Sequence, residues 1–536
     1  MSKPDLSVSE ERFIYGNKTS SLVIAVLLIA LAVTGILIAI YNTRFGPILN
    51  GDSVVYMQGA SNLLDGNGYS TLLGRGEVEP IKGFPPFTSI SLAIANLGRA
   101  DMVQTGRWAN AILFGLSILL AGFLVFRYSR SILAAFIAAA LITVQQAMVF
   151  VFSSVMSEGL FIFLLLLSIW TVTEYFWSGK IKWLITSGIL TALCFLTRYV
   201  GLVLIPVIGV GLLFFGKQNW KKRLFAILIF GIISAIPVIL WFVRNQIVSG
   251  SAIDRQIGLH LMSQNMRGLI SDNILSWLYI TMFGLPWRIE VLIFGILLVA
   301  LFVWFGIALF KSKEKWKENH SGGYQLPVML VILFFTYIFA IWANTSMLDA
   351  TTSQGAIGRY LSPLFVCMVV MLACITSVIA QQQKGILLKI FFSVIGFLLI
   401  GYYSSNLLTY LNNSNSGMRL GYGYTDNINY WTDEVALLKQ LDPDRPIITN
   451  DPQLLYALSN RFSYSLPLIE LAASSGSPLL DDSKLFSELS QGDYLVIIVR
   501  GDKEVSDFIP EIITDKLTLY KNTFYVWVYL LTDLSH

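Results

Sequence analysis

Two carboxylates and several cations stand where apolar runs of this sequence begin or end. Asp52 follows the first apolar run, and Glu158 opens a later one, while Lys82, Arg198 and Arg359 occupy comparable flanking positions. A carboxylate suits the acceptance of a proton from an attacking hydroxyl, and cations suit the binding of a departing phosphate. These residue types predict a group transfer from a phosphate if the fold brings them to one face.

Both carboxylates also have a purely structural interpretation. Asp52 suits the N-terminal cap of a short amphipathic helix, which we expect over 53–64 along the membrane surface. That role is compatible with catalysis. Glu158 suits the start of a helix because the helix dipole favours an acid there. An acid entering a membrane helix is nevertheless costly, which marks it as functional by default.

The cations carry the same two interpretations. Lys82 lies in the proline-rich aromatic turn Pro80–Phe87, which is either structural or a phosphate contact. Arg198 and Arg359 either reach lipid headgroups or bind an anion. The weaker candidates for substrate contact are Tyr56 in the first loop, Tyr360 beside Arg359, and His260 with Arg255 in the loop 244–288.

The elements that position these residues are membrane spans. The chain is 55% hydrophobic and only 13% charged, whereas a soluble domain carries roughly 25% charged residues. We therefore predict a polytopic α-helical membrane protein with about eleven spans. They are expected near 21–41, 108–126, 131–150, 159–177, 183–197, 200–216, 224–243, 290–310, 326–343, 360–380 and 386–410. The first run is too long for a signal-peptide core, so we expect it to be retained.

Two of these boundaries depend on length. The stretch 183–216 as one helix would measure about 50 Å, well beyond a hydrocarbon core of about 30 Å. Arg198 interrupts it, which predicts a helical hairpin. The run 132–176 is also too long for one span, and the polar group Ser153, Ser154, Ser157 and Glu158 predicts a turn there.

Basic residues test the orientation. With the N-terminus in the cytoplasm, the short inner loops carry Arg127/Arg130, Lys180/Lys182, the cluster 217–223, four lysines in 311–317, and Lys384/Lys389. That is the pattern of the positive-inside rule. The candidate residues then fall in the outer loops 42–106, 244–288 and 344–358 or at the outer ends of spans.

The chain divides into a membrane module over 1–410 and a small extracytoplasmic α/β domain over 411–536. Strand-length apolar segments near 446–449, 494–500 and 523–531 alternate with helix signals at Thr432 and at Asp451-Pro452. The region has no glycine-rich phosphate loop. Cys194, Cys367 and Cys374 lie inside apolar runs, so we expect buried thiols and no disulfide framework.

In these motifs the sequence resembles the GT-C glycosyltransferases, closest to the branch of protein O-mannosyltransferases and aminoarabinose transferases. The resemblance covers nearly the whole chain, and it is carried by short segments whose order and sidedness agree. They are Gly51-Asp52-Ser53, Asn62–Tyr69, Lys82 with Pro85-Pro86, Ser157-Glu158, Leu196–Tyr199, Arg359–Pro363 and Ile448–Pro452 with Leu454–Tyr456.

The resemblance implies a transferase that uses a sugar carried on a polyprenyl phosphate. Asp52 would be the general base toward an acceptor hydroxyl or amine, and Glu158 would orient the acceptor or assist. Lys82 and Arg359, with help from Arg198, would neutralise the lipid phosphate. The family's paired Asp-x-Asp or Asp-Glu motif is absent after Asp52, so we predict no metal and no other cofactor.

Two further function classes stay open. A transporter or flippase of lipid-linked glycans would show broken helices, midplane charges or inverted repeats, whereas these charges flank the outer mouth. An adhesion or sensory protein acting through its C-terminal region would leave the loop acids unexplained. The expected partners are a lipid-linked sugar and a lipid, glycan or protein acceptor, without nucleic acid, at a prokaryotic plasma membrane.

Overall fold

The structure is a computed structural model of the full chain. It describes residues 18–71, 79–215, 219–252, 262–277, 324–347, 357–382, 386–413, 423–465 without 444 and 462, 494–499 and 517–531, with further pieces of one to three residues between 258 and 307. The chain forms two compact units. One holds residues 1–42, 82–88 and 108–412, and the other holds 43–81, 89–107 and 413–536.

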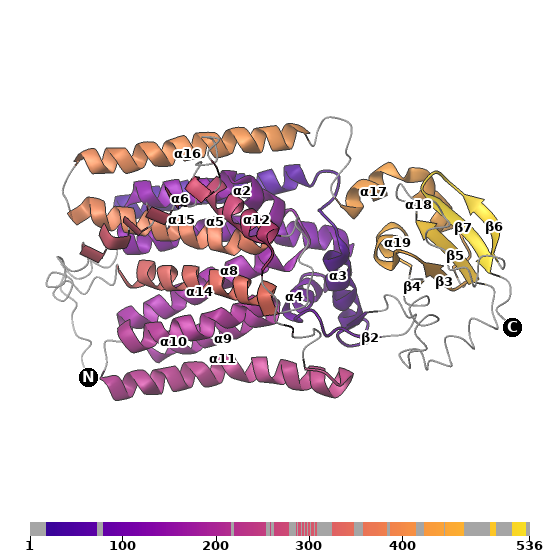
Figure 1. Cartoon of the computed structure of the whole chain (residues 1–536), viewed down its shortest axis with the longest axis horizontal. Helices are drawn as coiled ribbons and strands as arrows, with labels where there is room; N and C mark the ends of the chain where they lie inside the picture. Colours follow the sequence, from indigo (N-terminus) through magenta and orange to yellow (C-terminus); the bar gives the residue numbers. More distant parts are fainter. Residues whose placement is uncertain are drawn as a thin grey trace. The chain divides into compact units, whose positions relative to one another are not determined.

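The first unit is a bundle of apolar helices that run roughly side by side in Figure 1. Its helices are α2 (Lys18–Asn42), α5 (Met102–Ser129), α6 (Ile132–Val144), α7 (Gln146–Phe152), α8 (Ser157–Ser178), α9 (Ile181–Thr197), α10 (Leu204–Phe215), α11 (Trp220–Ser249), α12 (Gln264–Ser276), α14 (Gln325–Met347), α15 (Ile357–Gln382) and α16 (Ile386–Asn413). The most apolar windows of α8 and α15 are 78% and 83% buried, so these two helices form the centre of the bundle.

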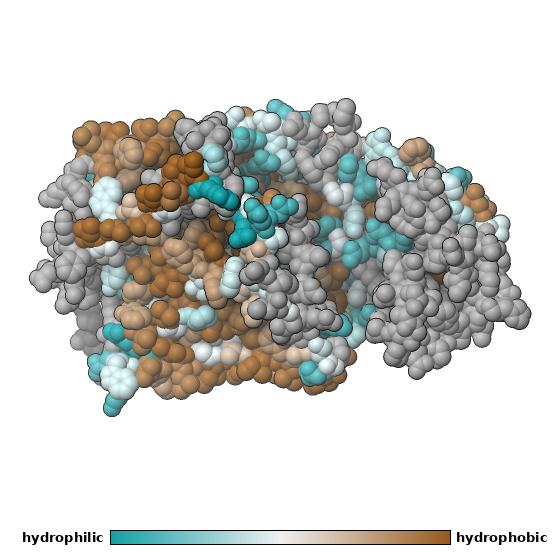
Figure 2. Space-filling model, viewed as in Figure 1, coloured by the Kyte–Doolittle hydropathy of each residue, from teal (hydrophilic) through white to brown (hydrophobic). Residues whose placement is uncertain are grey.

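The outer helices present apolar side chains to their surroundings. Leu22 on α2, Leu240 on α11 and Leu398 on α16 are each more than half exposed, and Figure 2 shows hydrophobic residues covering much of this part of the surface. Such a surface is unstable in water and suits lipid. The chain is therefore a multi-pass membrane protein.

Of the residues that the structure describes, seven helices are long and apolar enough to cross a membrane, or eight if the bent pair α6–α7 is one span. All eight coincide with predicted runs. The helices α9 and α10 are shorter, and the predicted span 290–310 falls on a stretch of which the structure describes only short pieces. The total of about eleven stays a prediction.

The predicted interruption at Arg198 is present. α9 ends at Thr197, Arg198 is extended, and a 3₁₀ turn over Tyr199–Val203 leads into α10. A Cβ on Gly201 would lie 2.5 Å from the backbone of Cys194 and Phe195. Seven residues of straight helix span about 10 Å, so this contact means that the chain turns back on itself here.

The predicted turn before Glu158 is also present, because α7 ends at Phe152 and α8 begins at Ser157. The sequence analysis did not expect the 64° bend between α6 and α7. It occurs at Gln145, whose backbone leaves the helical region with ψ of 119°. The run 131–150 is therefore two helices rather than one.

The second unit contains helix α3 (Gly51–Leu64), a two-stranded ribbon of β1 (Ser70–Thr71) with β2 (Glu79–Pro80), most of α4 (Phe87–Ala95), and a layered region formed by the C-terminal residues. That region has helices α17 (Tyr424–Tyr430), α18 (Thr432–Gln440) and α19 (Pro452–Ser459). Its strands are β3 (Ile447–Thr449), β4 (Tyr464–Ser465), β5 (Tyr494–Val499), β6 (Leu517–Asn522) and β7 (Val526–Leu531).

The five strands form a mixed sheet in the order β4-β3-β5-β7-β6, with β3 parallel to both neighbours and β7 antiparallel to both of its own. Leu438, Leu455 and Ile497 belong to the core between helices and sheet. The expected helix start is observed, since the Asp451 side chain caps α19 with Pro452 in its first turn. A separate domain over 411–536 stays a prediction, because the structure groups this region with most of the first loop.

Candidate active site

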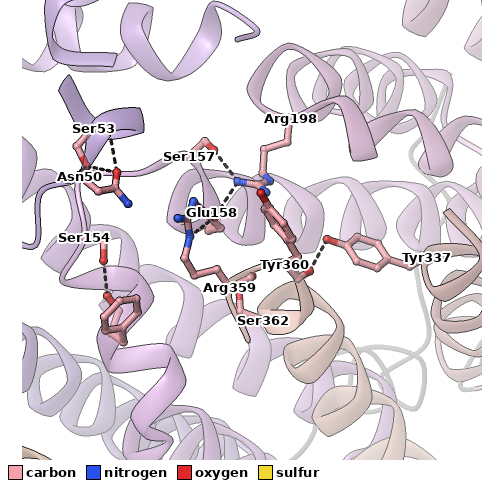
Figure 3. Close-up of polar contacts among 11 residues, drawn as sticks. Asn50, Ser53, Ser154, Ser157, Glu158, Arg198, Tyr337, Arg359, Tyr360 and Ser362 are labelled. Carbon is pink, nitrogen blue, oxygen red and sulfur yellow. Dashed lines mark hydrogen bonds and ion pairs between the residues drawn. The ribbon is translucent and has the colours of Figure 1, made fainter. Parts of the chain in front are cut away.

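Glu158 is the centre of a buried charge cluster in the first unit. Its side chain is 1% exposed. Its Oε1 atom accepts a hydrogen bond from Arg359 Nε at 3.0 Å and forms ion pairs with Arg198 Nη1 at 2.9 Å and Arg359 Nη2 at 3.0 Å. Arg198 Nη1 also donates to Ser157 Oγ at 2.8 Å. Figure 3 shows both guanidinium groups turned toward the single carboxylate.

Three helix ends create this cluster. Glu158 lies in the first turn of α8, Arg198 directly follows α9, and Arg359 lies in the first turn of α15. The extended backbone of Arg198 takes its side chain off the α9 axis. Because α8 packs against both α9 and α15, residues separated by 201 positions in sequence come into direct contact.

An aromatic residue borders the two arginines. The guanidinium carbons of Arg198 and Arg359 lie 5.4 Å and 5.9 Å from the centroid of the Tyr360 ring, within cation–π range. The Tyr337 hydroxyl donates to the Tyr360 carbonyl at 3.0 Å and so connects α14 to this turn. The ring therefore helps to hold both cations in place.

Among the residues that the structure describes, both arginines pair with the Glu158 carboxylate, and arginines stay protonated in proteins. Arg198 and Arg359 are only 15% and 13% exposed. Among the described residues, the buried Oε2 atom of Glu158 has no hydrogen-bond partner. Two buried guanidinium groups present fork-shaped sets of donors, which suit an anion with several oxygens, such as a phosphate.

A cavity of about 350 Å³ lies beside the cluster, with Arg359 on its wall. The α6–α7 bend, α12, α15 and α16 contribute to its lining, which is mostly polar or aromatic. It consists of Gln145, Gln146, Ala147, Phe150, Val151, Asn273, Ser276, Trp277, Gly358, Arg359, Tyr402, Tyr403 and Asn406. Two contacts shape it: the Tyr403 hydroxyl donates to the Trp277 carbonyl, and Asn273 Nδ2 donates to the Leu269 carbonyl.

Sequence reasoning missed this cavity. A signal was available, because the amides Gln145 and Gln146 interrupt the apolar run 131–150. Asn406 likewise interrupts the run 386–410. Polar groups inside apolar membrane segments are costly, so they point to an internal polar site.

The backbone of Lys82 is anchored near the residue that follows Arg198. The Tyr199 hydroxyl donates to the Lys82 carbonyl at 3.1 Å, and Asn245 Nδ2 donates to the same oxygen at 3.3 Å. Trp241 Nε1 donates to the Tyr199 hydroxyl at 3.1 Å. The proline-rich turn is therefore held against the 3₁₀ turn and α11, which agrees with its structural interpretation and leaves a phosphate contact open.

Asp52 belongs to the second unit, and its expected role as helix cap is wrong. The cap of α3 is Asn50: its side chain accepts from the Ser53 amide at 3.1 Å, and Ser53 Oγ accepts from the Asn50 amide at 3.2 Å (Figure 3). This reciprocal arrangement is a capping box. Asp52 sits half-buried in the first turn, so helix capping does not account for it.

The helix expected over 53–64 is present as α3, but its expected amphipathic character is wrong. α3 is buried at every position from Ser53 to Ala60, and Tyr56 is only 4% exposed. Thr71 Oγ1 donates to Gln58 Oε1 at 2.5 Å, and Asn62 Nδ2 donates to the Ser70 carbonyl at 2.9 Å. Packing on all sides replaces the polar face that a surface helix requires.

Residues of the C-terminal region surround the start of α3. The Tyr424 amide donates to the Leu49 carbonyl at 2.9 Å, and a Cβ on Gly51 would lie 2.0 Å from Gln453 Oε1. Burial raises the pKa of the Tyr424 hydroxyl, and the charges of Asp451 and Asp52 raise it further. Tyr424 and Gln453 therefore lie near Asp52, which sequence reasoning did not anticipate.

The remaining candidates are Arg255, His260 and the three cysteines. Arg255 and His260 lie outside the described residues. Cys194, Cys367 and Cys374 are free and buried, as their apolar surroundings predicted. Within the described ranges there is no group of three or more His, Cys, Asp or Glu side chains that could hold a metal ion, and metal independence stays a prediction.

Residues 91–241 match the family model described as dolichyl-phosphate-mannose-protein mannosyltransferase. This segment contains Glu158 and Arg198 but covers less than half of the chain. A comparison with curated proteins finds no match.

Two solved structures share the fold. ArnT from Cupriavidus metallidurans bound to undecaprenyl phosphate matches with a TM-score of 0.51 and 12% identity, over 95% of this chain and 98% of that one. The archaeal oligosaccharyltransferase AglB from Archaeoglobus fulgidus, in complex with an inhibitory peptide and a dolichol-phosphate, matches with 0.50 and 14%, over 88% and 69%. The expected GT-C glycosyltransferase resemblance is confirmed.

Proposed function

We propose that this chain, a GT-C glycosyltransferase by its fold and family match, moves a sugar from a polyprenyl-phosphate donor to an extracytoplasmic acceptor. The observation that carries the proposal is the buried pair of arginines, Arg198 and Arg359, which converge on the Glu158 carboxylate at 2.9 and 3.0 Å. The acceptor is a hydroxyl or amine of a lipid, glycan or protein.

The arginine pair binds the phosphate of the donor. Arg198 and Arg359 present planar forks of donors that suit phosphate oxygens, and their low exposure strengthens each interaction. As the sugar leaves, the phosphate gains negative charge, and preorganised cations stabilise that charge in the transition state. Glu158 holds the two guanidinium groups in position, and Lys82 adds a further cation.

Asp52 acts as the general base. The acceptor oxygen or nitrogen attacks the anomeric carbon on the face opposite the phosphate, and its proton passes to the Asp52 carboxylate. The bond between the anomeric carbon and the phosphate oxygen breaks, and the electron pair leaves with the polyprenyl phosphate. One displacement of this kind inverts the configuration at the anomeric carbon.

Two findings support the proposed donor and the proposed base. The two solved structures with the same fold, ArnT and AglB, contain undecaprenyl phosphate and dolichol-phosphate, both polyprenyl phosphates. In addition, Asn50 supplies the helix cap, so α3 does not need the Asp52 carboxylate for its start. The proposed setting is a prokaryotic plasma membrane with the N-terminus in the cytoplasm, following the positive-inside distribution of Lys and Arg.

The test is release of free polyprenyl phosphate by the purified protein in nanodiscs, given a panel of polyprenyl-phosphate sugars and acceptors. We expect release by the wild type and a loss of roughly 10² to 10⁴-fold in Asp52→Asn, the usual contribution of a general base. The matched control is Asp65→Asn, since Asp65 caps the other end of α3 and forms an exposed pair with Arg99 at 2.6 Å.

Asp65→Asn should keep the wild-type rate within about twofold, because exposed ion pairs contribute little. If no donor is consumed, or if Asp52→Asn is as active as the wild type, the catalytic assignment is wrong. Movement of an intact lipid-linked sugar between leaflets, without release of phosphate, would instead establish the transporter.

A further inference from the structure

The main-chain carbonyl of Lys82 is the meeting point of two side chains from distant parts of the first unit. It accepts from the Tyr199 hydroxyl at 3.1 Å and from Asn245 Nδ2 at 3.3 Å. We propose that Tyr199 and Asn245 are positioning residues, which hold Lys82 so that its ammonium group shares the donor phosphate with Arg198. The inference rests on the proposed function, because that function gives Lys82 the role of a further cation.

Tyr199 connects Lys82 to the arginine pair along a short path. It directly follows Arg198, so the two Cα atoms are about 3.8 Å apart, and it opens the 3₁₀ turn Tyr199–Val203. Arg198 in turn pairs with Glu158 at 2.9 Å. The proline-rich turn that contains Lys82 is therefore bonded to the same reversal of the chain that contains one of the two arginines.

The donor and acceptor chemistry of these side chains fixes the direction of each hydrogen bond. Arg244 Nη1 lies 3.0 Å from Asn245 Oδ1, and a guanidinium group can only donate. The amide oxygen of Asn245 therefore faces Arg244, and its Nδ2 group donates to Lys82. Trp241 Nε1 also only donates, and it bonds the Tyr199 hydroxyl oxygen at 3.1 Å, so the hydroxyl proton points to the Lys82 carbonyl.

The Tyr199 ring is fixed by packing as well as by hydrogen bonds. It stacks on Phe242 of α11 with an angle of 8° between the rings, and it meets Phe195 of α9 edge to face with the centroids 5.7 Å apart. Support from two helices holds the hydroxyl at one place before any ligand binds. Such preorganisation reduces the entropy that binding costs.

The position of Asn245 is not explained by the formation of a membrane span. Its side chain is 1% exposed, and it lies within the stretch Trp220–Val248 of α11, which is apolar enough to cross a membrane. A polar side chain in such a segment is costly, and it commonly marks a functional site. Here its hydrogen bond goes to a turn outside the helix, and that turn contains a cation.

Anchoring the main chain matters because the lysine side chain is flexible. An ammonium group on a four-carbon stem can reach many positions, and it loses that freedom when it binds an anion. Both hydrogen bonds use the Lys82 carbonyl, and neither uses the ammonium group. A fixed main chain restricts where the cation can reach, and preorganised positive charge stabilises the departing phosphate.

The experiment measures the affinity of the purified protein in nanodiscs for sugar-free polyprenyl phosphate. Lys82→Met should weaken binding by about 10- to 100-fold, the usual value of a hydrogen bond to a charged group. Tyr199→Phe and Asn245→Leu each remove one bond to the Lys82 carbonyl and should weaken binding by about 3- to 10-fold. KM for a polyprenyl-phosphate sugar should rise by the same factors. Tyr199→Phe removes a single oxygen atom, so it decides the question if Asn245→Leu does not fold.

Combined variants show whether the two residues act through Lys82. In the Lys82→Met background, Tyr199→Phe or Asn245→Leu should weaken binding by less than about twofold more, because residues that act through one group are not additive. A merely structural role would add its full loss. The matched control is Gln246→Leu, an exposed amide next to Asn245 that donates to the Gly250 carbonyl at 2.9 Å. It should bind polyprenyl phosphate with wild-type affinity.

The outcomes separate the inference from the proposed function. Wild-type affinity in Tyr199→Phe and Asn245→Leu, or a full additional loss in the Lys82→Met background, overturns the inference and leaves glycosyl transfer standing. Wild-type affinity in Lys82→Met also overturns it, because Lys82 then does not bind the phosphate. A wild-type protein that neither binds polyprenyl phosphate nor consumes any donor overturns the proposed function as well.

Discussion

Replacing Glu158 by Gln tests the charge cluster directly. The substitution keeps the size of the side chain but removes the one negative charge shared by Arg198 and Arg359. Removing one partner of a buried ion pair costs about 3 to 5 kcal/mol, because an uncompensated charge remains buried. Here two guanidinium groups, 15% and 13% exposed, lose their carboxylate together, so we expect the upper part of that range.

Glu174 offers a matched control in the same helix. It is 8% exposed, and its carboxylate accepts from a single arginine, Arg127, at 3.0 and 3.3 Å. Glu174→Gln leaves one directly paired arginine, Arg127, without its carboxylate. Glu174 lies at the opposite end of α8 from Glu158. Its loss of stability should therefore be smaller, about 3 kcal/mol.

The assay is denaturant unfolding in detergent, followed by tryptophan fluorescence, with and without sugar-free polyprenyl phosphate. A ligand at 100 times its dissociation constant stabilises the folded protein by about 2.7 kcal/mol. In Glu158→Gln the phosphate replaces the lost negative charge, so it should bind more tightly and stabilise this variant more than it does the wild type. In Glu174→Gln the ligand should stabilise as in the wild type.

Two results would refute this reasoning. If Glu158→Gln unfolds at the wild-type denaturant concentration, the cluster does not depend on the carboxylate. If polyprenyl phosphate stabilises Glu158→Gln and Glu174→Gln equally, the arginine pair is not the phosphate site.

Three predictions concern the second unit. Gly51→Ala places a methyl group 2.0 Å from Gln453 Oε1, so it should lower thermal stability and donor turnover, and the added change Gln453→Ala should restore both. Asn50→Ala removes the cap of α3 and should cost about 0.5 to 2 kcal/mol in denaturant unfolding; a smaller loss than for Ser61→Ala would contradict the capping box. Burial and the charge of Asp65 raise the pKa of Tyr456 from 10.0 to about 12. The folded state therefore holds this proton more tightly, and stability should fall as pH rises from 10 to about 12. Tyr456→Phe should lose that part of the pH dependence, as measured by unfolding at each pH.

Much of the membrane unit could be predicted from the sequence, because length and polarity decide it locally. Apolar runs long enough to span gave the positions of the described spans. A charged residue at Arg198 and the polar group before Glu158 interrupt such runs, and the helices end there. Because charge is costly to bury, the sequence alone identifies Glu158, Arg198 and Arg359 as candidates.

Other features depend on contacts that no local pattern contains. The choice of Asn50 rather than Asp52 as cap depends on backbone geometry at one turn. The burial of α3 depends on packing against β1 and α19, the latter about 400 residues later in the chain. The cavity needs a bend at Gln145 together with α12, α15 and α16. The sequence by itself determined which residues are too polar for an apolar surrounding, since that is a property of each side chain. Only the tertiary structure decided which of them meet, because an ion pair between residues 201 positions apart exists only when the packing of separate helices brings their ends together.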